Sequence, residues 1–275
     1  MIFTHKQVDG SRERPASALG RFRWVLRSSN NDVDDCLFIV FFHSRFNSGQ
    51  GHKEKRMFID CKTELEWLAH RVNYLTASDA GNYTGLNPYD QNGMLHLWEE
   101  KVGLRKRADI SEKPAVKFGK TAEEHIRALF MLMHPEYTLQ YDPFGLYVSD
   151  DHPFMAATLD GLLLNNENAS HEIFEAKTGT VRTKSAWDAW NSGELPINYW
   201  CQILHQSECV KWAGGIWVVG LITKEWEPDR STLFMHHYDV RDPEFVEDRK
   251  KIVGYATDMW KLIQTRRRPN MAFAI

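Results

Sequence analysis

Apolar and polar positions alternate regularly only from Thr63 onward. Thr63 opens a capping box, in which side chains satisfy the first free N–H groups of a helix, and this predicts a helix through about Arg71. A second, short helix is expected to begin at Ser78, a residue type favoured at helix starts, and to end at Gly85. A third helix is predicted over residues 90–101. The regular part of the chain therefore begins with three short helices.

A long amphipathic helix is predicted between Pro114 and about His134. Proline fits the first turn of a helix, where its missing N–H is not needed. Apolar residues then recur at intervals of three and four positions, so one face of this helix should be buried. The residues on the predicted face are Phe118, Ala122, Ile126, Leu129 and Met133.

Apolar runs bounded by turn residues predict strands in the second half of the chain. They lie near residues 144–149, 154–164, 172–178, 214–222 and 232–240. Three more helices are predicted at about 183–191, 196–211 and 243–264. Helices that flank a central mixed sheet indicate an α/β or α+β fold class.

Residues 1–60 lack this regularity. They contain ten lysines and arginines against seven acids, and residues 47–52 form a loop-like run of Asn, Ser, Gly, Gln and His. We therefore expect a poorly patterned N-terminal extension over residues 1–60 and one domain over residues 61–275. The first 56 residues are hypothesised to be only weakly ordered.

Composition limits the class of protein. The chain has 275 residues, 43% of them hydrophobic, which suits one large domain. A formal charge of −3 argues against a protein that coats DNA through a generally basic surface. The four cysteines form no C-x-x-C pair, which indicates free thiols. No apolar run approaches the roughly 20 residues of a membrane span, and no signal peptide is recognisable, so we expect a cytoplasmic protein.

Two acids and a lysine in the middle of the chain are the first candidates for chemistry. Asp160 is followed by the tripeptide from Glu175 to Lys177. Residues at i and i+2 of a strand share a face, so Glu175 and Lys177 should lie side by side, with Asp160 on a neighbouring strand. Carboxylate oxygens suit Mg²⁺, and a lysine beside the metal can position a water. A Glu-x-Lys tripeptide alone is more often a surface ion pair.

Five segments in a fixed order make the catalytic interpretation stronger. They are Arg71-Val72-Asn73-Tyr74-Leu75-Thr76-Ala77-Ser78, Phe118-Gly119-Lys120 with Glu123, Thr158-Leu159-Asp160-Gly161-Leu162, Glu175-Ala176-Lys177 and Tyr199-Trp200-Cys201-Gln202. Over residues 63–222 the chain resembles the YqaJ-like viral recombinase, or phage lambda exonuclease, family of the PD-(D/E)XK nuclease superfamily. The resemblance implies a restriction-endonuclease-like core. The proline of the superfamily's name is Leu159 here, which weakens the match more than the expected chemistry.

The resemblance assigns roles in cleavage to five positions. Asp160, Glu175 and the main-chain carbonyl of Ala176 would bind Mg²⁺, with Mn²⁺ as a substitute. Lys177 would act on the attacking water. Glu123 would supply a further acid from the long helix. These roles agree with the need to stabilise negative charge during phosphoryl transfer.

Three more positions would support and orient the substrate. Gln202 matches a glutamine that supports the lysine and the water, although it could also bridge groups in a core. Arg71 and Ser78 match positions that hold a terminal 5′-phosphate, and an arginine can grip a phosphate through two parallel hydrogen bonds. Arg71 could instead form a surface ion pair, and Ser78 could simply cap a helix.

The resemblance implies an Mg²⁺-dependent exonuclease that degrades duplex DNA ends from 5′ to 3′ and leaves 3′ overhangs. A phage or prophage origin, a bacterial cytoplasm, a single-strand annealing partner and a ring-shaped homo-oligomer follow from the same resemblance. The main alternative is a restriction- or repair-type DNA endonuclease on the same fold. A non-catalytic DNA-binding module would leave the acids and the lysine without a purpose. For Trp187, Trp190 and Trp200 we favour core packing over base stacking.

Overall fold

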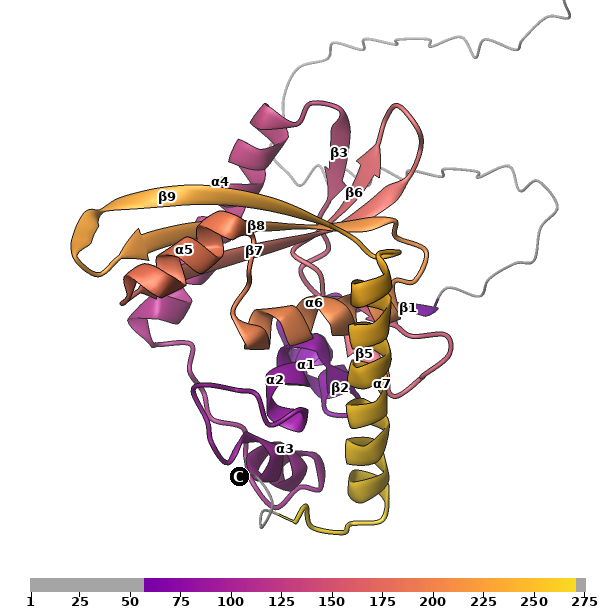
Figure 1. Cartoon of the computed structure of the whole chain (residues 1–275). Helices are drawn as coiled ribbons and strands as arrows, with labels where there is room; N and C mark the ends of the chain where they lie inside the picture. Colours follow the sequence, from indigo (N-terminus) through magenta and orange to yellow (C-terminus); the bar gives the residue numbers. More distant parts are fainter. Residues whose placement is uncertain (1–56, 271–275) are drawn as a thin grey trace, which may run out of the picture. The chain divides into compact units, whose positions relative to one another are not determined.

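The computed structural model describes residues 57–270, which all belong to the second of two units, 1–51 and 52–275. Within this range the helices are α1 (Glu64–Arg71), α2 (Ala80–Tyr83), α3 (Gly93–Lys101), α4 (Pro114–Met133), α5 (Lys184–Ser192), α6 (Ile197–Cys209) and α7 (Pro243–Gln264), with a 3₁₀ turn, η1 (Ala77–Asp79). The strands are β1 (Met57–Asp60), β2 (Leu75–Thr76), β3 (Tyr137–Gln140), β4 (Gly145–Val148), β5 (Met155–Ala157), β6 (Gly161–Asn165), β7 (His171–Val181), β8 (Gly215–Lys224) and β9 (Glu227–Asp239). The order confirms a mixed α/β fold (Figure 1).

The strands form two mixed sheets. The smaller has the order β1-β4-β5-β2, with β2 and β5 parallel. The larger has the order β3-β6-β7-β8-β9, with β7 and β8 parallel and the other pairs antiparallel. In the larger sheet Gly161 lies opposite Phe174, so the residue before β6 comes next to the middle of β7.

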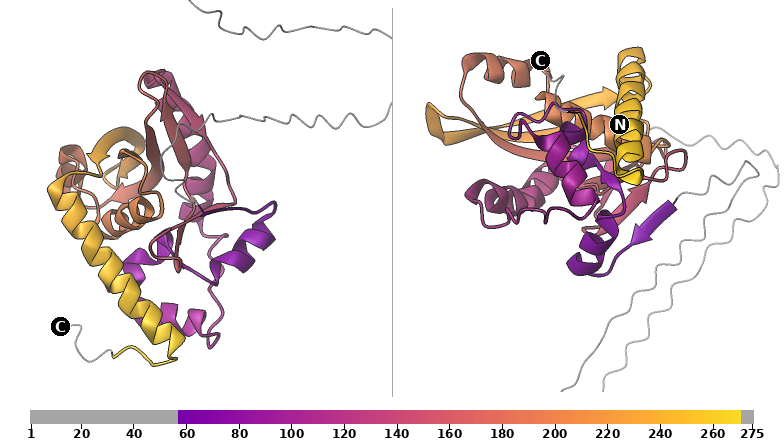
Figure 2. Two further views of the ribbon diagram at one scale, coloured as in Figure 1. Left: turned by 90° about the vertical axis from the view of Figure 1, so that its right-hand side faces the viewer. Right: turned by 90° about the horizontal axis from the view of Figure 1, so that it is seen from below.

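Helix α4 covers one face of the larger sheet (Figure 2). Its buried side chains are Ala122, Ile126 and Phe130, which pack with apolar residues of β6, β7 and β8. The predicted apolar face was therefore wrong in part, because Phe118, Leu129 and Met133 are exposed. At about 100° per residue the two faces are equally wide, each about 80°, but the buried face is rotated by about 40° around the helix axis, from Phe118 toward Phe130.

Helices α5 and α6 pack against the opposite face of the larger sheet, and α7 packs on the outside of α6. From Cys201 to Cys209 nearly all of α6 is buried, including polar residues. The three tryptophans belong to this core, as predicted: Trp190 is buried, Trp187 packs on Phe234, and Trp200 packs on Phe245. Helix α6 therefore lies between the sheet and α7, with its polar residues inside the fold.

Local sequence signals explain where several helices begin. The hydroxyl oxygens of Thr63 and Thr183 accept hydrogen bonds from the first turns of α1 and α5, and the Asp242 carboxylate does the same for α7. Ser78 is not such a cap, contrary to prediction. It lies inside η1, which starts after Thr76.

The sequence missed three short strands, β1, β2 and β3. The predicted strand over residues 154–164 is two strands, β5 and β6, with Asp160 in the break between them. Strand β1 pairs with β4, so residues 57–60 are part of a sheet although they fall within the predicted extension of residues 1–60. The rest of that extension lies outside the described residues.

No helix within residues 57–270 is long and apolar enough to cross a membrane. Cys61, Cys201 and Cys209 are buried free thiols.

Candidate functional site

Strand β7 carries two of the predicted catalytic residues on one face. Glu175 is 2% exposed, and the Lys177 ammonium donates a hydrogen bond to its Oε1 atom. Ala176 points to the other face and packs in the core under α4. The i, i+2 relation predicted from the sequence therefore holds.

Helix α6 completes the surroundings of this pair. Gln202 accepts a hydrogen bond from the Lys177 ammonium over 3.0 Å and donates one to Glu175 Oε1 over 2.6 Å. One turn later, the fully buried Gln206 donates to the other carboxylate oxygen, Oε2. Sequence analysis missed Gln206, although its i+4 spacing from Gln202 would have placed both amides on one helix face. Both oxygens of Glu175 are thus held in fixed positions.

Asp160 reaches this cluster from the break before β6. Its Oδ2 accepts a hydrogen bond from the Ala176 N–H over 2.9 Å, and its main-chain carbonyl lies 3.4 Å from Arg127 Nη1. Burial and the neighbouring Glu175 raise the pKa of Asp160 well above its usual value, with Lys177 partly opposing the shift. The predicted acids and lysine therefore lie in one electrostatically linked group.

Glu123 approaches from α4. Gly119, one turn earlier, lets the helix come close to β7, because a Cβ atom there would lie 3.3 Å from the Thr178 hydroxyl oxygen. Burial raises the pKa of Glu123, Arg127 opposes that shift, and Glu175 adds to it. Glu123 therefore interacts electrostatically with Glu175 and Lys177, although α4 lies on the opposite face of the sheet from their side chains.

Lys177 remains protonated in this arrangement. Burial alone would lower the pKa of its ammonium, but Glu175 and Asp160 outweigh burial and raise it. The ring of Tyr199 covers the ammonium, with 4.9 Å between Nζ and the ring centre. Lys177 is therefore a fixed cation that can orient a water or stabilise a developing negative charge.

The donor set suits a hard divalent cation. Asp160, Glu175 and Glu123 bring carboxylate oxygens, the ligand type that a hard cation prefers, to one region, and of the three only Glu175 is fully buried. Among residues 57–270, no three His, Cys, Asp or Glu side chains form a group that could hold a metal ion by themselves. An ion here would need Asp160, Glu175, the Ala176 carbonyl and water, and Mg²⁺ commonly retains several waters.

A second cluster surrounds Arg71. Its guanidinium donates to the Ser78 hydroxyl over 2.6 Å and to the Thr76 hydroxyl over 3.2 Å. The structure therefore brings together the two residues expected to bind a phosphate. Ser78 is exposed, whereas Thr76 is buried. The accessible part of the cluster is the Arg71–Ser78 pair.

A buried carboxylate organises this cluster. Asp79, 1% exposed, accepts hydrogen bonds from the Thr76 N–H and hydroxyl and lies 3.5 Å from Lys101 and 3.4 Å from Arg107. Burial would raise the pKa of Asp79, but Lys101, Arg107 and Arg71 outweigh it and hold the pKa far below its usual range. Three cations around one carboxylate leave excess positive charge. Sequence analysis missed Asp79, Lys101 and Arg107 because their proximity depends on the tertiary fold.

Trp67 connects the two clusters. Its ring lies under the Arg71 guanidinium, 4.3 Å from the ring centre, and its Nε1 donates to the Thr158 hydroxyl over 2.8 Å. Thr158 is two residues before Asp160. The cation-rich cluster therefore has a fixed position relative to the carboxylates.

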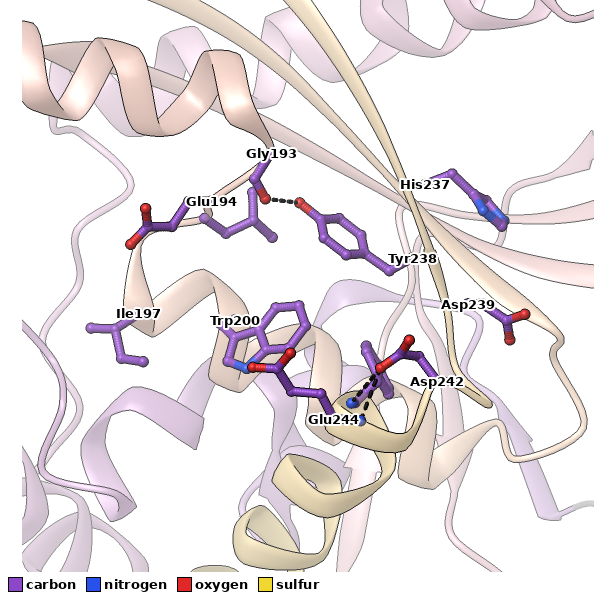
Figure 3. Close-up of a pocket in the computed structure, with 11 residues that line it drawn as sticks. Gly193, Glu194, Ile197, Trp200, His237, Tyr238, Asp239, Asp242 and Glu244 are labelled. Carbon is purple, nitrogen blue, oxygen red and sulfur yellow. Dashed lines mark hydrogen bonds between the residues drawn. The ribbon is translucent and has the colours of Figure 1, made fainter.

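A separate pocket of about 520 Å³ lies between the start of α6, the end of β9 and the start of α7 (Figure 3). Four acids line it: Glu194, Asp239, Asp242 and Glu244. Trp200 also lines it. Residues two positions apart point to different sides of a helix, so the pocket lies on a different side of α6 from Gln202 and its partners Glu175 and Lys177. Its negative charge makes it unsuitable for DNA phosphates.

Comparisons with known proteins agree with this arrangement. A family model described as the YqaJ-like viral recombinase domain matches residues 66–211. An alkaline exonuclease (LHK-Exo) from Laribacter hongkongensis is 19% identical, with a TM-score of 0.54 over 74% of this chain and 96% of that chain. LHK-Exo in complex with dAMP gives 18% identity and a TM-score of 0.53 over the same shares. Comparison with curated protein sequences gave no match. The predicted restriction-endonuclease-like fold is thus confirmed.

Proposed function

The chain belongs to the YqaJ-like viral recombinase family, since the family model covers more than half of it, and from this premise we propose that it is a phage-type DNA exonuclease. The observation that carries the proposal is the convergence of Asp160, Glu175, Lys177 and Gln202 at the middle of β7, inside the larger sheet. An acid pair with a fixed ammonium is suited to hydrolysing a phosphodiester. The alkaline exonucleases of similar fold support the same conclusion.

In the proposed reaction a divalent ion, Mg²⁺ or Mn²⁺, when bound by Asp160, Glu175 and the Ala176 carbonyl, supplies a nucleophilic water and neutralises phosphate charge. Lys177 stabilises the charge that grows on the phosphate oxygens, and Gln202 holds its ammonium in place. Glu123 adds negative charge on the α4 side.

The Arg71–Ser78 pair supports cleavage that starts at a DNA end. We propose that it binds the terminal 5′-phosphate, because a guanidinium and a hydroxyl match phosphate oxygens and the surrounding cluster is positively charged. Trp67 then fixes how far this phosphate lies from the cleavage site. This arrangement favours degradation from 5′ to 3′, which leaves a 3′ overhang.

The family also motivates three proposals about context. We propose a ring-shaped homo-oligomer, cooperation with a single-strand annealing protein, and action in the cytoplasm of a bacterial host. Light scattering of the purified protein tests the first of these. A monomer at micromolar concentration would contradict it.

The function is tested by digesting three DNA substrates in Mg²⁺ and in EDTA. They are linear duplex with 5′-phosphate, the same duplex with 5′-hydroxyl, and closed circular DNA. We expect cleavage only with metal, a preference for the 5′-phosphate, and intact circles. Rapid cutting of circles would favour the endonuclease alternative.

Two variants separate the roles in this assay. Arg71→Ala should lose the preference for 5′-phosphate while it still cleaves, and Lys177→Ala should lose cleavage on every substrate. Arg241→Ala is the matched control for Arg71, since its guanidinium is exposed and paired only with Asp239. If Arg71→Ala kept the full preference, the phosphate would bind elsewhere.

A further inference from the structure

Tyr89 is unusually exposed for an aromatic residue in an ordered loop. It is 81% exposed, more than any other large hydrophobic side chain within residues 57–270. Its N–H donates to the Asn87 side-chain oxygen over 3.0 Å, and the Asn87 amide donates to Asn82 over 2.7 Å. Exposing apolar ring surface to water is unfavourable. A loop held by side-chain hydrogen bonds nevertheless presents this ring to solvent.

This loop, between α2 and α3, packs against the first turn of α6. Gly81 makes the contact possible: a Cβ atom there would lie 3.3 Å from the Asn198 Cβ and 3.5 Å from the Asn87 Cβ. The two asparagines therefore approach one point on α2 from different elements. Tyr89 and Tyr199 follow them closely in sequence, so their side chains start from adjoining backbone.

Tyr199 and Tyr89 lie between Lys177 and solvent. The Tyr199 ring lies over the Lys177 ammonium at 4.9 Å, and Tyr89 lies near enough to Tyr199 to help raise the pKa of its hydroxyl, which burial raises most. Tyr89 is thus a neighbour of the residue whose ring covers Lys177. It is the exposed end of this series.

We propose that Tyr89 is a stacking platform for an unpaired base of the DNA strand being cut, at a nucleotide next to the scissile phosphate. The inference rests on the proposed nuclease function and deepens it by assigning a base-binding subsite. Tyrosine carries no charge to hold a phosphate, whereas its ring face suits any base, and such stacking does not depend on sequence. Separating a base pair at a duplex end requires energy, which stacking on a protein ring offsets.

The platform should matter most where a base pair must be opened. On a fully paired end, Tyr89→Ala should lower kcat/KM roughly 5- to 140-fold, the range that corresponds to one lost base stack. On an end with mismatched terminal nucleotides, the loss should be several-fold smaller. Tyr89→Phe and Tyr89→Trp should cleave both ends nearly as well as wild type. Tyr255→Ala, at a 51% exposed tyrosine on α7, is the matched control and should be neutral.

These substitutions separate stacking from a structural role. If the hydroxyl contact with Tyr199 were what matters, Tyr89→Phe would fail as badly as Tyr89→Ala, and the proposal would be wrong. An equal loss on paired and mismatched ends would also overturn it, because a distorted active site affects both.

A measurement without cleavage keeps this test independent of the proposed function. The Lys177→Ala variant is mixed with duplexes that carry the fluorescent base 2-aminopurine at the end, and Tyr89→Ala is added to that background. We expect the change in 2-aminopurine fluorescence on binding to be lost with Tyr89→Ala and kept with Tyr89→Phe. If the wild type cleaved no DNA but this pattern held, the nuclease function would fail and the subsite would stand. An unchanged signal in Tyr89→Ala would refute the subsite alone.

Discussion

The buried ion cluster around Asp79 allows a stringent test of how the proposed phosphate-binding pair, Arg71 and Ser78, is held in place. Asp79→Asn keeps the shape of the side chain and removes its charge. Lys101, only 6% exposed, then loses its carboxylate partner while its ammonium still faces the carbonyls of Arg71 and Tyr74. An unpaired cation in the interior is far more costly than a broken surface pair.

The size of the effect follows from this burial. Removing one partner of a buried ion pair destabilises a protein by about 3–5 kcal/mol, and each kcal/mol shifts Tm by about 2–4 °C in a domain of this size. We therefore expect Asp79→Asn to lower Tm by roughly 6–20 °C. Glu99→Gln, which breaks the more exposed pair with Arg105 at 3.0 Å, is the matched control and should cost at most about 1 kcal/mol.

Urea denaturation of the single and double variants measures the coupling. Lys101→Met in the Asp79→Asn background removes the unpaired charge, so the double variant should recover much of the lost stability. The Asp79→Asn variant should also discriminate less between 5′-phosphate and 5′-hydroxyl ends, because Thr76 connects Asp79 to Arg71. If Asp79→Asn unfolded at the same urea concentration as the wild type, the reasoning about buried charge would be refuted.

Three other outcomes follow from the site and its surroundings. Asp160→Asn should abolish the heat of Mg²⁺ binding in calorimetry while circular dichroism stays unchanged; a retained heat would place the metal elsewhere. Burial lowers the pKa of His205 to about 4 from 6.5, so as pH falls through that window the unfolded chain takes up a proton that the folded chain does not. Up to roughly 3 kcal/mol of stability should be lost, and a pH-independent urea midpoint between pH 7 and pH 4 would contradict this. Gln206→Leu should lower kcat through a less ordered Glu175, with KM little changed; an equal kcat would show that Gln202 alone suffices.

The sequence was sufficient to predict how the two charged residues of β7 lie relative to each other. Period-two spacing put Glu175 and Lys177 on one strand face, and the structure agrees. The helix starts at Thr63 and Asp242 could also be predicted from the sequence, because a helix cap depends only on neighbouring residues. Local rules failed for Asp160, which was placed on a continuous strand but lies in the break before β6.

Contacts between distant segments could not be predicted in the same way. Asp79, Lys101 and Arg107 come from three separate elements, and nothing in their spacing shows that they meet around one buried carboxylate. Very short strands such as β2 carry too few residues to show a period. The buried face of α4 differed from prediction because the sheet selects which apolar residues it covers.

The distribution of charge explains how a chain with net charge −3 can handle a polyanion. Positive charge is concentrated where Arg71, Lys101 and Arg107 surround Asp79, whereas at the second cluster the single cation Lys177 faces the carboxyl groups of Asp160 and Glu175. A DNA end alone would be drawn to the first cluster and repelled from the second. A divalent ion bound there would supply the positive charge that the second cluster needs to hold a phosphate. Under the proposed function, productive binding would couple an anchored 5′-phosphate to a loaded metal site, and the pairing of these two conditions would restrict cleavage to DNA ends.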